Sequence, residues 1–167
     1  EIFHESVESI HSEAIRMKEM VEQLLLLAKH NEEWSIQLEV IDLGEHVRQT
    51  VKAFESAYHR EVHFQPQQED IEVMADTQKL KQLTYIILDN AKKYSEDIIT
   101  VEVGVKDESP FIQIIDKGLG IPKDDLEKVF DRFYRVDKAR SRNMGGTGLG
   151  LSIAREIVSA HGGVIAL

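Results

Sequence analysis

Two glycine-containing segments carry the residue types that are most suited to binding a ligand. Residues 116–120, Asp-Lys-Gly-Leu-Gly, place one carboxylate beside two glycines, and residues 145–150 place four glycines within six positions. A carboxylate accepts hydrogen bonds without donating them, so it suits an exocyclic amine. Glycines that let the backbone approach a ligand, followed by a helix N-terminus, suit phosphate. Together the segments predict one ligand with an amine at one end and phosphates at the other, a nucleotide such as ATP.

The composition argues against several other kinds of site. The 167 residues carry a net charge of −10 and no cysteine, so we expect no nucleic-acid-binding surface, disulfide framework or cysteine metal site. The longest uninterrupted apolar run, Leu24–Ala28, is far shorter than the ~20 residues that a membrane span needs. We see no signal peptide. We therefore expect a soluble chain, and its start without Met and its end after a Gly-Gly turn suggest a piece of a longer protein.

Residues 1–30 carry apolar side chains at alternating steps of four and three, which is a heptad seam. The seam comprises Phe3, Val7, Ile10, Ala14, Met17, Val21, Leu24 and Ala28. Such a helix buries little by itself, so it predicts a partner helix from its own chain or from a second subunit. A single amphipathic helix lying on its own domain is the alternative. Leu25 and Leu27 widen the stripe and favour a four-helix arrangement. A polar break then separates a domain at residues 1–33 from one at residues 34–167.

The rest of the chain alternates between helical and strand patterns. Helices are predicted at residues 43–58 with Asp42 as N-cap, and at 76–94, 122–129 and 149–160. Strands are predicted at residues 37–40, 62–65, 71–75, 98–105, 111–115 and 164–167. Residues 131–144 are polar without a clear period and predict a mobile loop. Because two consecutive strands pair as a hairpin among helices, we expect an α+β sandwich, with helices on one face of a mixed sheet and a long helix before it.

The helix at residues 76–94 brings polar side chains to one side. Asn90 lies on or beside its predicted buried stripe, and Lys93 and Tyr94 follow within the next turn. The stripe comprises Leu80, Leu83, Ile87, Ala91 and Tyr94. An amide oxygen is a suitable ligand for Mg²⁺, and a lysine ammonium suits a phosphate. Alternatively, Asn90 bonds a neighbouring backbone group, because a buried amide must be satisfied. The grouping favours a ligand site.

Three loop segments have both a structural and a functional interpretation. Asp116 either accepts from a ligand amine or simply ends a strand in a turn. Phe130 and Phe133 are expected to anchor the segment that follows. Arg132 and Arg135 then either bring positive charge to the glycine run or remain solvated. The glycine run lacks the Gly-Lys-Ser/Thr ending of a P-loop and does not follow a strand. We expect it to form a lid with glycine hinges, in which a helix N-terminus cradles phosphate.

Four motifs occur in the order and with the gaps found in sensor histidine kinases, which this chain resembles. They are similar to the N, G1, F and G2 boxes of that family: Asn90-Ala91-x-Lys93-Tyr94, Asp116-x-Gly118-x-Gly120-Ile121-Pro122, Phe130-x-x-Phe133-Tyr134-Arg135 and Gly146-Thr147-Gly148-Leu149-Gly150-Leu151. Each motif alone is weak evidence, whereas their joint occurrence is highly specific. The resemblance covers residues 35–167. The opening helix also resembles the second helix of the family's dimerisation hairpin.

The resemblance implies a Bergerat-type ATP-binding fold that holds MgATP between the N-box helix and the lid. Asn90 would hold Mg²⁺, Lys93 would contact phosphate and Tyr94 would line the pocket. Asp116 would accept from the adenine amine, and Arg135 would reach the γ-phosphate. The further nucleotide-binding residues would be Gly118, Gly120, Ile121, Phe133, Gly146, Thr147, Gly148, Leu149 and Gly150.

The resemblance also implies a reaction and partners. The γ-phosphoryl group would pass to a histidine of the dimerisation domain and then to an aspartate of a response regulator. The full-length protein would be a homodimer through the opening helix, on the cytoplasmic side of the cell membrane.

Three departures from the family pattern qualify these expectations. The phosphoacceptor motif is missing, and neither His4 nor His11 is expected to replace it. We therefore expect this chain to bind ATP without phosphorylating itself. Ile86 stands where the family usually has a polar Asn, and the chain stops at Leu167, before the family's final strands.

Two other functions remain open from the sequence. One is a nucleotide-sensing dimerisation module that has lost transfer activity, which Ile86 supports. The other is a related ATPase of the same fold, such as a chaperone, topoisomerase or mismatch-repair protein. Those proteins place a Glu general base where this chain has Ile86, and an aliphatic side chain cannot activate water.

Overall fold

The computed structural model describes residues 35–136 and 146–167, together with Ala14, Met17 and Val21. The opening helix as a whole, with His4 and His11, and residues 137–145 of the predicted lid therefore lie outside the described residues. Across the described part of the chain, every helix is too short or too polar to cross a bilayer.

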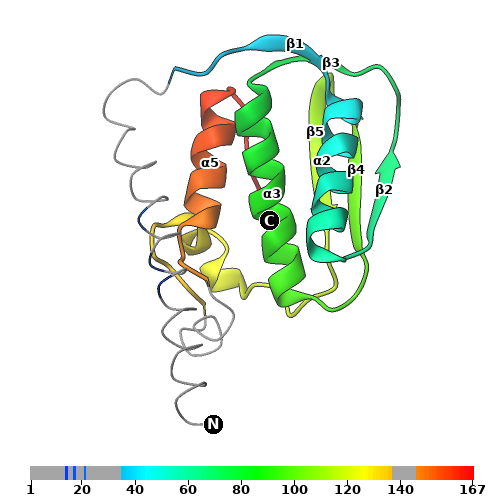
Figure 1. Cartoon of the computed structure of the whole chain (residues 1–167). Coiled ribbons are helices and arrows are strands. Elements are labelled where there is room, and N and C mark those ends of the chain that lie inside the picture. Colours follow the sequence, from blue (N-terminus) through cyan, green and yellow to red (C-terminus); the bar gives the residue numbers. More distant parts are fainter. Residues whose placement is uncertain (1–13, 15–16, 18–20, 22–34, 137–145) are drawn as a thin grey trace.

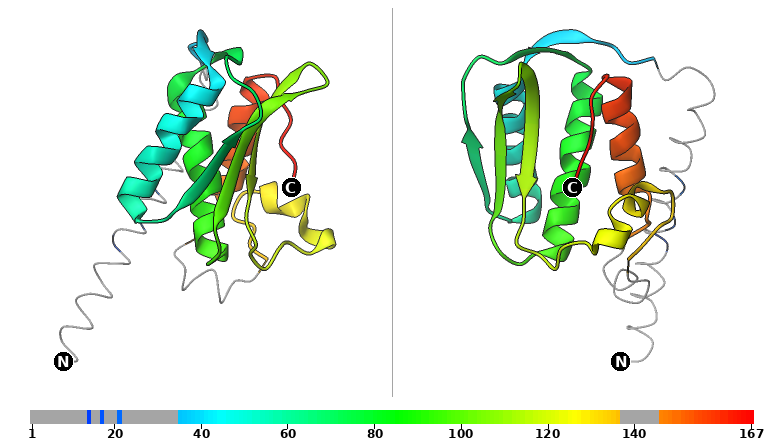
Figure 2. Two further views of the ribbon diagram at one scale, coloured as in Figure 1. Left: turned by 90° about the vertical axis from the view of Figure 1, so that its right-hand side faces the viewer. Right: turned by 180° about the vertical axis from the view of Figure 1, so that it is seen from behind.

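Three helices lie side by side in front of a sheet (Figure 1). They are α2 (Leu43–Tyr58), α3 (Thr77–Tyr94) and α5 (Gly150–Ala160). The sheet has the strand order β2–β4–β5, formed by Val62–Pro66, Ile99–Lys106 and Ser109–Ile115. Strand β2 pairs with β4 in parallel and β4 with β5 antiparallel, so the sheet is mixed. Figure 2 shows the helices on one face of this sheet. The predicted α+β sandwich with helices on one face of a mixed sheet is confirmed.

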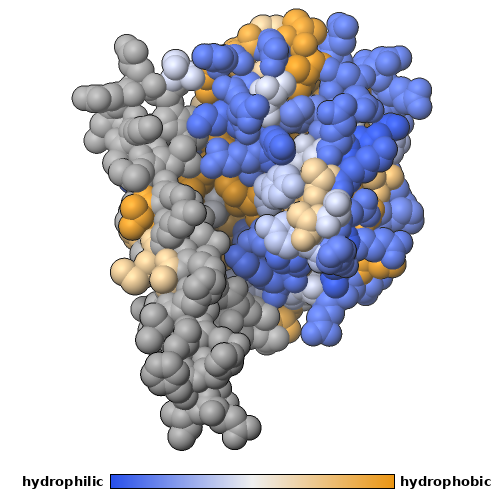
Figure 3. Space-filling model, viewed as in Figure 1, coloured by the Kyte–Doolittle hydropathy of each residue, from blue (hydrophilic) through white to orange (hydrophobic). Residues whose placement is uncertain are grey.

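A second, two-stranded antiparallel sheet joins β1 (Glu39–Asp42) to β3 (Glu72–Ala75). It crosses the ends of the helices in Figure 1. Its outward face is apolar, because the paired residues Val40 and Met74 are both exposed, as is Leu38 just before β1. This apolar surface is visible at the top of Figure 3, above the largely hydrophilic outer surface of the helices.

Two apolar clusters hold the layers together. The first lies between the sheet and helices α2 and α3, where β4 contributes alternate residues Ile99, Val101 and Val103, all fully buried. The second joins α5 to α3 and comprises Leu149, Ile153 and Ile157, packed against Leu83 and Ile86. Helix α5 is therefore fixed to the same helix that carries Asn90, which brings the glycine run beside α3.

Aspartate N-caps begin both long helices. Asp42 accepts the N–H of Glu45 at 2.7 Å, as predicted for α2. Asp76 does the same for α3, and one oxygen accepts from both Gln78 and Lys79 at 3.0 Å. The other Asp76 oxygen accepts the N–H of Gln37 at 3.0 Å, in the segment that leads into β1. Asp76 thus joins the entry of the domain to the start of α3.

The backbone N–H of Asp76 also reaches α5, because it donates to Nε2 of His161 at 3.0 Å. The other ring nitrogen of His161, Nδ1, lies 2.8 Å from the carbonyl of Ile157 and donates to it in the matching tautomer. Burial by itself would raise the pKa of the Asp76 carboxyl. The backbone N–H groups of Lys79, Gln37 and Gln78 outweigh burial and hold that pKa below its ordinary value.

We expect Asp76→Asn to lower the free energy of unfolding at neutral pH by about 1 kcal/mol, since an amide can still cap α3 but carries no charge and cannot also accept the N–H of Gln37. The folded-state pKa of Asp76 lies below the unfolded one. Its carboxylate therefore stabilises the fold when the pH is above the unfolded-state pKa. This stabilisation is lost as the pH falls through the folded-state pKa. In urea unfolding, the difference in the free energy of unfolding between the unaltered chain and Asp76→Asn should have its largest value at pH 7 and should shrink below about pH 4. A difference that stays constant would contradict this account.

Several predicted elements differ from the structure. Strand β1 begins two residues later than predicted, at Glu39, because its register with β3 pairs Glu39 with Ala75. The predicted helix at residues 122–129 is wrong: two 3-10 helices, Lys123–Asp125 and Lys128–Phe130, stand there. Residues 164–167 form no strand. The buried stripe of α3 consists of Leu80, Thr84, Leu88 and Ala91, whereas Tyr94 is exposed.

Candidate functional site

The loop after β5 packs directly on the last turn of α3. An added Cβ on Gly118 would lie 2.5 Å from the carbonyl oxygen of Tyr94 and 2.7 Å from Oδ1 of Asp116. Real Cβ atoms essentially never come so close, so this contact requires glycine. The N–H of Gly118 donates to the same Asp116 oxygen at 2.7 Å. The structure therefore brings Asp116, which is exposed, to the end of the helix that carries Asn90, Lys93 and Tyr94.

Charged side chains brace this end of α3. Arg60 donates to the carbonyl of Ser95 at 3.0 Å and also to the carbonyl of Asp97. Lys117 lies 3.6 Å from the carboxylate of Asp97. These contacts hold the loop between α3 and β4 against the loop of Asp116.

The glycine run meets the predicted aromatic anchor. The N–H of Phe133 donates to the carbonyl of Gly148 at 2.8 Å. Gly148 has a φ of 77°, and an added Cβ would lie 2.9 Å from the backbone of Phe133. Phe133 itself has a φ of 65° and is 52% exposed, so the prediction that its side chain anchors the segment is wrong, whereas Phe130 is buried as predicted. An exposed aromatic residue in a left-handed conformation is unusual, and such backbone strain is concentrated at functional sites.

Only part of the predicted mobile loop, residues 131–136, is described, and this part is held by specific contacts. Arg132 pairs with Glu156 of α5 at 2.9 Å. The hydroxyl of Tyr134 donates to Oδ1 of Asp125 at 2.6 Å, and this bond raises the pKa of Tyr134. For these six residues the structure shows an ordered turn, because α5 and a 3-10 helix both supply partners.

Arg135 carries two buried side-chain nitrogens that could bind an anion. Its side chain is half-buried, and its Nε and Nη2 atoms are buried without a hydrogen-bond partner in the described part of the chain. A guanidinium offers five donors and remains charged, so burying two of its nitrogens unpaired is unfavourable. A phosphate oxygen would satisfy them. The residues present therefore fit a phosphate-bearing ligand at this point.

Helix α5 begins at the glycine run and lacks the capping seen elsewhere. Its N-cap residue, Leu149, makes no side-chain capping bond, so the first amides of the helix are left for other acceptors. The side chain of Leu149 is fully buried, and its N–H donates to Oγ1 of Thr147 at 3.4 Å. Gly150 lies against α3, where an added Cβ would come within 3.3 Å of Ile86. Gly146 and Thr147 stand directly before this start and are half-buried.

The remaining predicted site residues lie on α3 and on the loop after Gly118. Asn90 and Lys93 are half-buried, Gly120 has a φ of 70°, and Ile121 is half-buried. In the described ranges, no group of three or more His, Asp or Glu side chains could hold a metal ion. A Mg²⁺ ion at Asn90 would take its other oxygen ligands from water and from the nucleotide.

Two features were missed by sequence reasoning. Ile86 packs into the α3–α5 cluster. Its spacing of three residues from Leu83 places both side chains on one face of the helix and could have predicted this packing. Asp89 pairs with Lys93 at 2.5 Å, and the four-residue spacing of opposite charges on one helix was the signal there.

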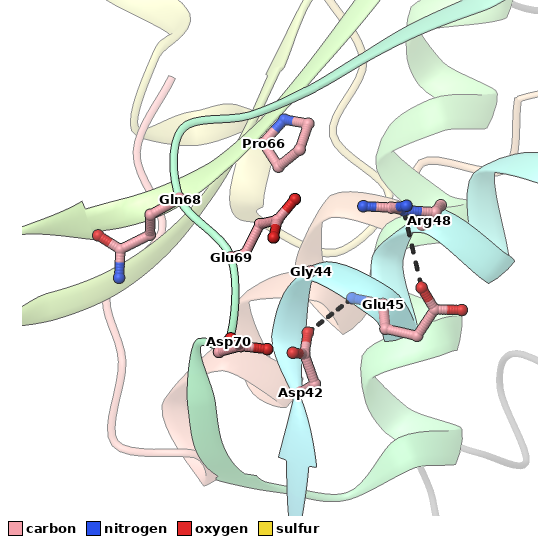
Figure 4. Close-up of a pocket in the computed structure, with 8 residues that line it drawn as sticks. All are labelled: Asp42, Gly44, Glu45, Arg48, Pro66, Gln68, Glu69 and Asp70. Carbon is pink, nitrogen blue, oxygen red and sulfur yellow. Dashed lines mark hydrogen bonds and ion pairs between the residues drawn. The ribbon is translucent and has the colours of Figure 1, made fainter.

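A separate surface pocket of about 230 Å³ lies at the start of α2 (Figure 4). It is lined by Asp42, Gly44, Glu45, Arg48, Pro66, Gln68, Glu69 and Asp70. Arg48 lies 3.7 Å from the carboxylate of Glu45. Four carboxylates against one guanidinium would repel phosphate, and none of the predicted nucleotide-site residues lines this pocket.

Residues 75–167 match the family described as histidine kinase-, DNA gyrase B-, and HSP90-like ATPase. The sensor histidine kinase YkoH of Bacillus subtilis (strain 168) is 44% identical over 162 residues, which cover 97% of this chain and 36% of YkoH. The chain thus spans about a third of the length of this relative.

Solved structures of two further proteins share the fold across 98% of this chain. Full-length ShkA in complex with AMPPNP has a TM-score of 0.81 at 21% identity, with 35% of that chain covered. The histidine kinase ThkA in complex with the response regulator TrrA has a TM-score of 0.73 at 23% identity, with 46% covered.

Proposed function

Because the chain belongs to the family of histidine kinase-, DNA gyrase B- and HSP90-like ATPases, we propose that it is the ATP-binding catalytic part of a sensor histidine kinase. The full-length protein transfers the γ-phosphoryl group of ATP to a histidine, for relay to a response regulator. The observation that carries this proposal is that Nε and Nη2 of Arg135 are buried without a partner in the described ranges. Arg135 lies two residues after Phe133, whose N–H donates to the carbonyl of Gly148 in the glycine run. The likeness to YkoH over nearly the whole chain supports the kinase branch of the family.

The proposed site binds the nucleotide at its adenine and at its phosphates. Asp116, fixed against the end of α3 by Gly118, accepts from the adenine amine. Tyr94 lines the pocket beside it. Asn90 supplies an amide oxygen to Mg²⁺, and Lys93 and Arg135 face the phosphates.

The glycine run completes the site, with Gly146, Thr147, Gly148, Leu149 and Gly150 at the start of α5. Gly120, Ile121 and Phe133 flank the nucleotide. Bound Mg²⁺ neutralises phosphate charge, and the protein itself contributes position and fixed positive charge, which is most of what phosphoryl transfer requires.

Ile86 argues against a hydrolytic ATPase. It stands where a related ATPase needs a general base, and it is packed against α5. An aliphatic side chain in that contact cannot activate water. Vigorous ATP hydrolysis by this chain would overturn this preference. Labelling of a histidine on an acceptor domain added in trans separates the kinase from a module that binds nucleotide without transfer.

Dimerisation and location belong to the same proposal. Ala14, Met17 and Val21 are helical, and Met17 and Val21 are largely exposed at predicted seam positions. A second copy would cover them, which supports a homodimer of the full-length protein. Like the sensor kinases it resembles, that protein would act at the cytoplasmic side of the cell membrane.

Calorimetric titration with a non-hydrolysable ATP analogue, with and without Mg²⁺, tests the proposed function. We expect saturable binding at one site, tighter with Mg²⁺ than with EDTA. Absence of binding in both conditions would contradict the proposal.

We expect Asp116→Asn to weaken ATP binding at least about tenfold and to reduce the preference for ATP over GTP. An amide can present its NH₂ group to adenine, where only an acceptor fits. Competition titrations of the unaltered and variant proteins with ATP and GTP measure both effects. If the ATP-to-GTP ratio is unchanged, Asp116 is a turn residue rather than a base-reading residue.

A further inference from the structure

A carboxylate that the site description leaves unused holds the phosphate-binding lysine. Oδ2 of Asp89 lies 2.5 Å from the ammonium of Lys93, one helical turn further along α3. Oδ1 of the same carboxylate lies 3.2 Å from the ammonium of Lys92. The three side chains are 26–30% exposed, so water screens these pairs less than it would on an open surface.

Lys92 has a second partner that keeps Asp89 oriented. Its ammonium lies 3.7 Å from the centre of the Tyr58 ring, a cation–π contact. Tyr58 in turn packs on the buried ring of Phe54, with 4.7 Å between the ring centres. Lys92 is therefore tied to the core at the end of α2, and it fixes one oxygen of Asp89. The other oxygen is left directed at Lys93.

The two cations assigned to the phosphates are thus in different states. The buried Nε and Nη2 atoms of Arg135 have no partner in the described ranges, whereas Lys93 already forms an ion pair with Asp89, a carboxylate that it shares with Lys92. A phosphate can bind Arg135 without breaking an existing ion pair, but to bind Lys93 it must displace the carboxylate of Asp89. The displaced carboxylate then stands beside the bound phosphates and repels them.

We propose that Asp89 is a positioning residue that competes with the nucleotide's phosphates for Lys93. It lowers the affinity for phosphate-bearing ligands and so promotes their release. This inference rests on the proposed function, because it requires that the phosphates of ATP approach Lys93.

Asp89→Asn keeps the shape of the side chain and removes its charge, and it is expected to tighten MgATP binding about two- to fivefold, the range set by a partly exposed ion pair. Thermal stability should fall slightly at the same time, because Lys92 and Lys93 lose their partner. If Asp89 had a purely structural role, Asp89→Asn would lower both MgATP affinity and thermal stability. Binding of adenosine, which carries no phosphate, should not change.

A double-mutant cycle with Lys93→Met identifies the competitor. In the Lys93→Met background, Asp89→Asn should change MgATP affinity by much less than in the unaltered chain. Glu45→Gln is the matched control, because it removes one negative charge and one ion-pair partner, that of Arg48, at the start of α2. We expect Glu45→Gln to leave MgATP affinity unchanged.

The outcomes separate the inference from the function on which it depends. If MgATP binds to the unaltered chain but Asp89→Asn weakens binding or leaves it unchanged, the inference is wrong and the proposed function stands. Equal tightening in the Lys93→Met background would show plain repulsion rather than competition for Lys93, and would also overturn it. If the unaltered chain binds no nucleotide, both the inference on Asp89 and the proposed function are wrong.

Discussion

Gly118→Ala is expected to weaken MgATP binding by more than about tenfold. The new methyl group would lie 2.5 Å from the carbonyl oxygen of Tyr94 and 2.7 Å from Oδ1 of Asp116. The first neighbour is helix backbone, which cannot move aside cheaply, so the loop must shift away from α3. That shift separates Asp116, the proposed adenine-binding carboxylate, from the helix that carries the proposed phosphate-binding side chains. Isothermal titration of the folded variant measures the loss.

Gly162→Ala is the matched control for this substitution. Gly162 has a φ of 73°, and an added Cβ would meet nothing within 4 Å. Alanine there costs about 1 kcal/mol of stability through its left-handed backbone, without a steric clash. Its MgATP affinity should equal that of the unaltered chain. Normal binding by Gly118→Ala would show that the contact with Tyr94 does not position Asp116.

The second large effect is expected at Asn90. Asn90→Ala removes the amide oxygen proposed as the protein's ligand to Mg²⁺, so the gain in ATP affinity on adding Mg²⁺ should largely disappear. Affinity in EDTA should change little, because the contacts to adenine and Arg135 remain. The ratio of the two dissociation constants is the quantity to measure.

The same experiment separates the two interpretations of Asn90. If its amide serves only to satisfy a neighbouring backbone group, the alanine variant will lose thermal stability and keep its full Mg²⁺ dependence. If it holds the metal, the variant will lose Mg²⁺ dependence and keep most of its stability. A variant with both properties intact would contradict both roles.

Local patterns were sufficient to predict most elements. The helix at residues 43–58 and its Asp42 cap agree with the structure to the residue. The hairpin of β4 and β5 was found, and the turn itself lies at Asp107 and Glu108, which both have positive φ. These features depend on caps, turns and short periodicities, which neighbouring residues specify.

Elements whose limits depend on distant partners were predicted less well. The start of β1 follows its pairing with β3, which is not a local property. The buried face of α3 was predicted with Ile87 and Tyr94, yet the structure buries Thr84 and Leu88. Helix α3 packs against both α2 and α5, and the sequence pattern of a helix with two packed sides does not define one stripe.

The sequence by itself determined the family, because four short motifs occur in the family's order and with its gaps; the adenine, phosphate and metal roles that these motifs indicate are predictions. The tertiary structure alone decided how those residues meet. It placed Gly118 against Tyr94 and Gly148 against Phe133, and it joined Asp76 to His161 across 85 residues of sequence. It also left the buried nitrogens of Arg135 unpaired while Lys93 is paired with Asp89. Such contacts depend on which faces of distant elements pack together, and no local pattern records that choice.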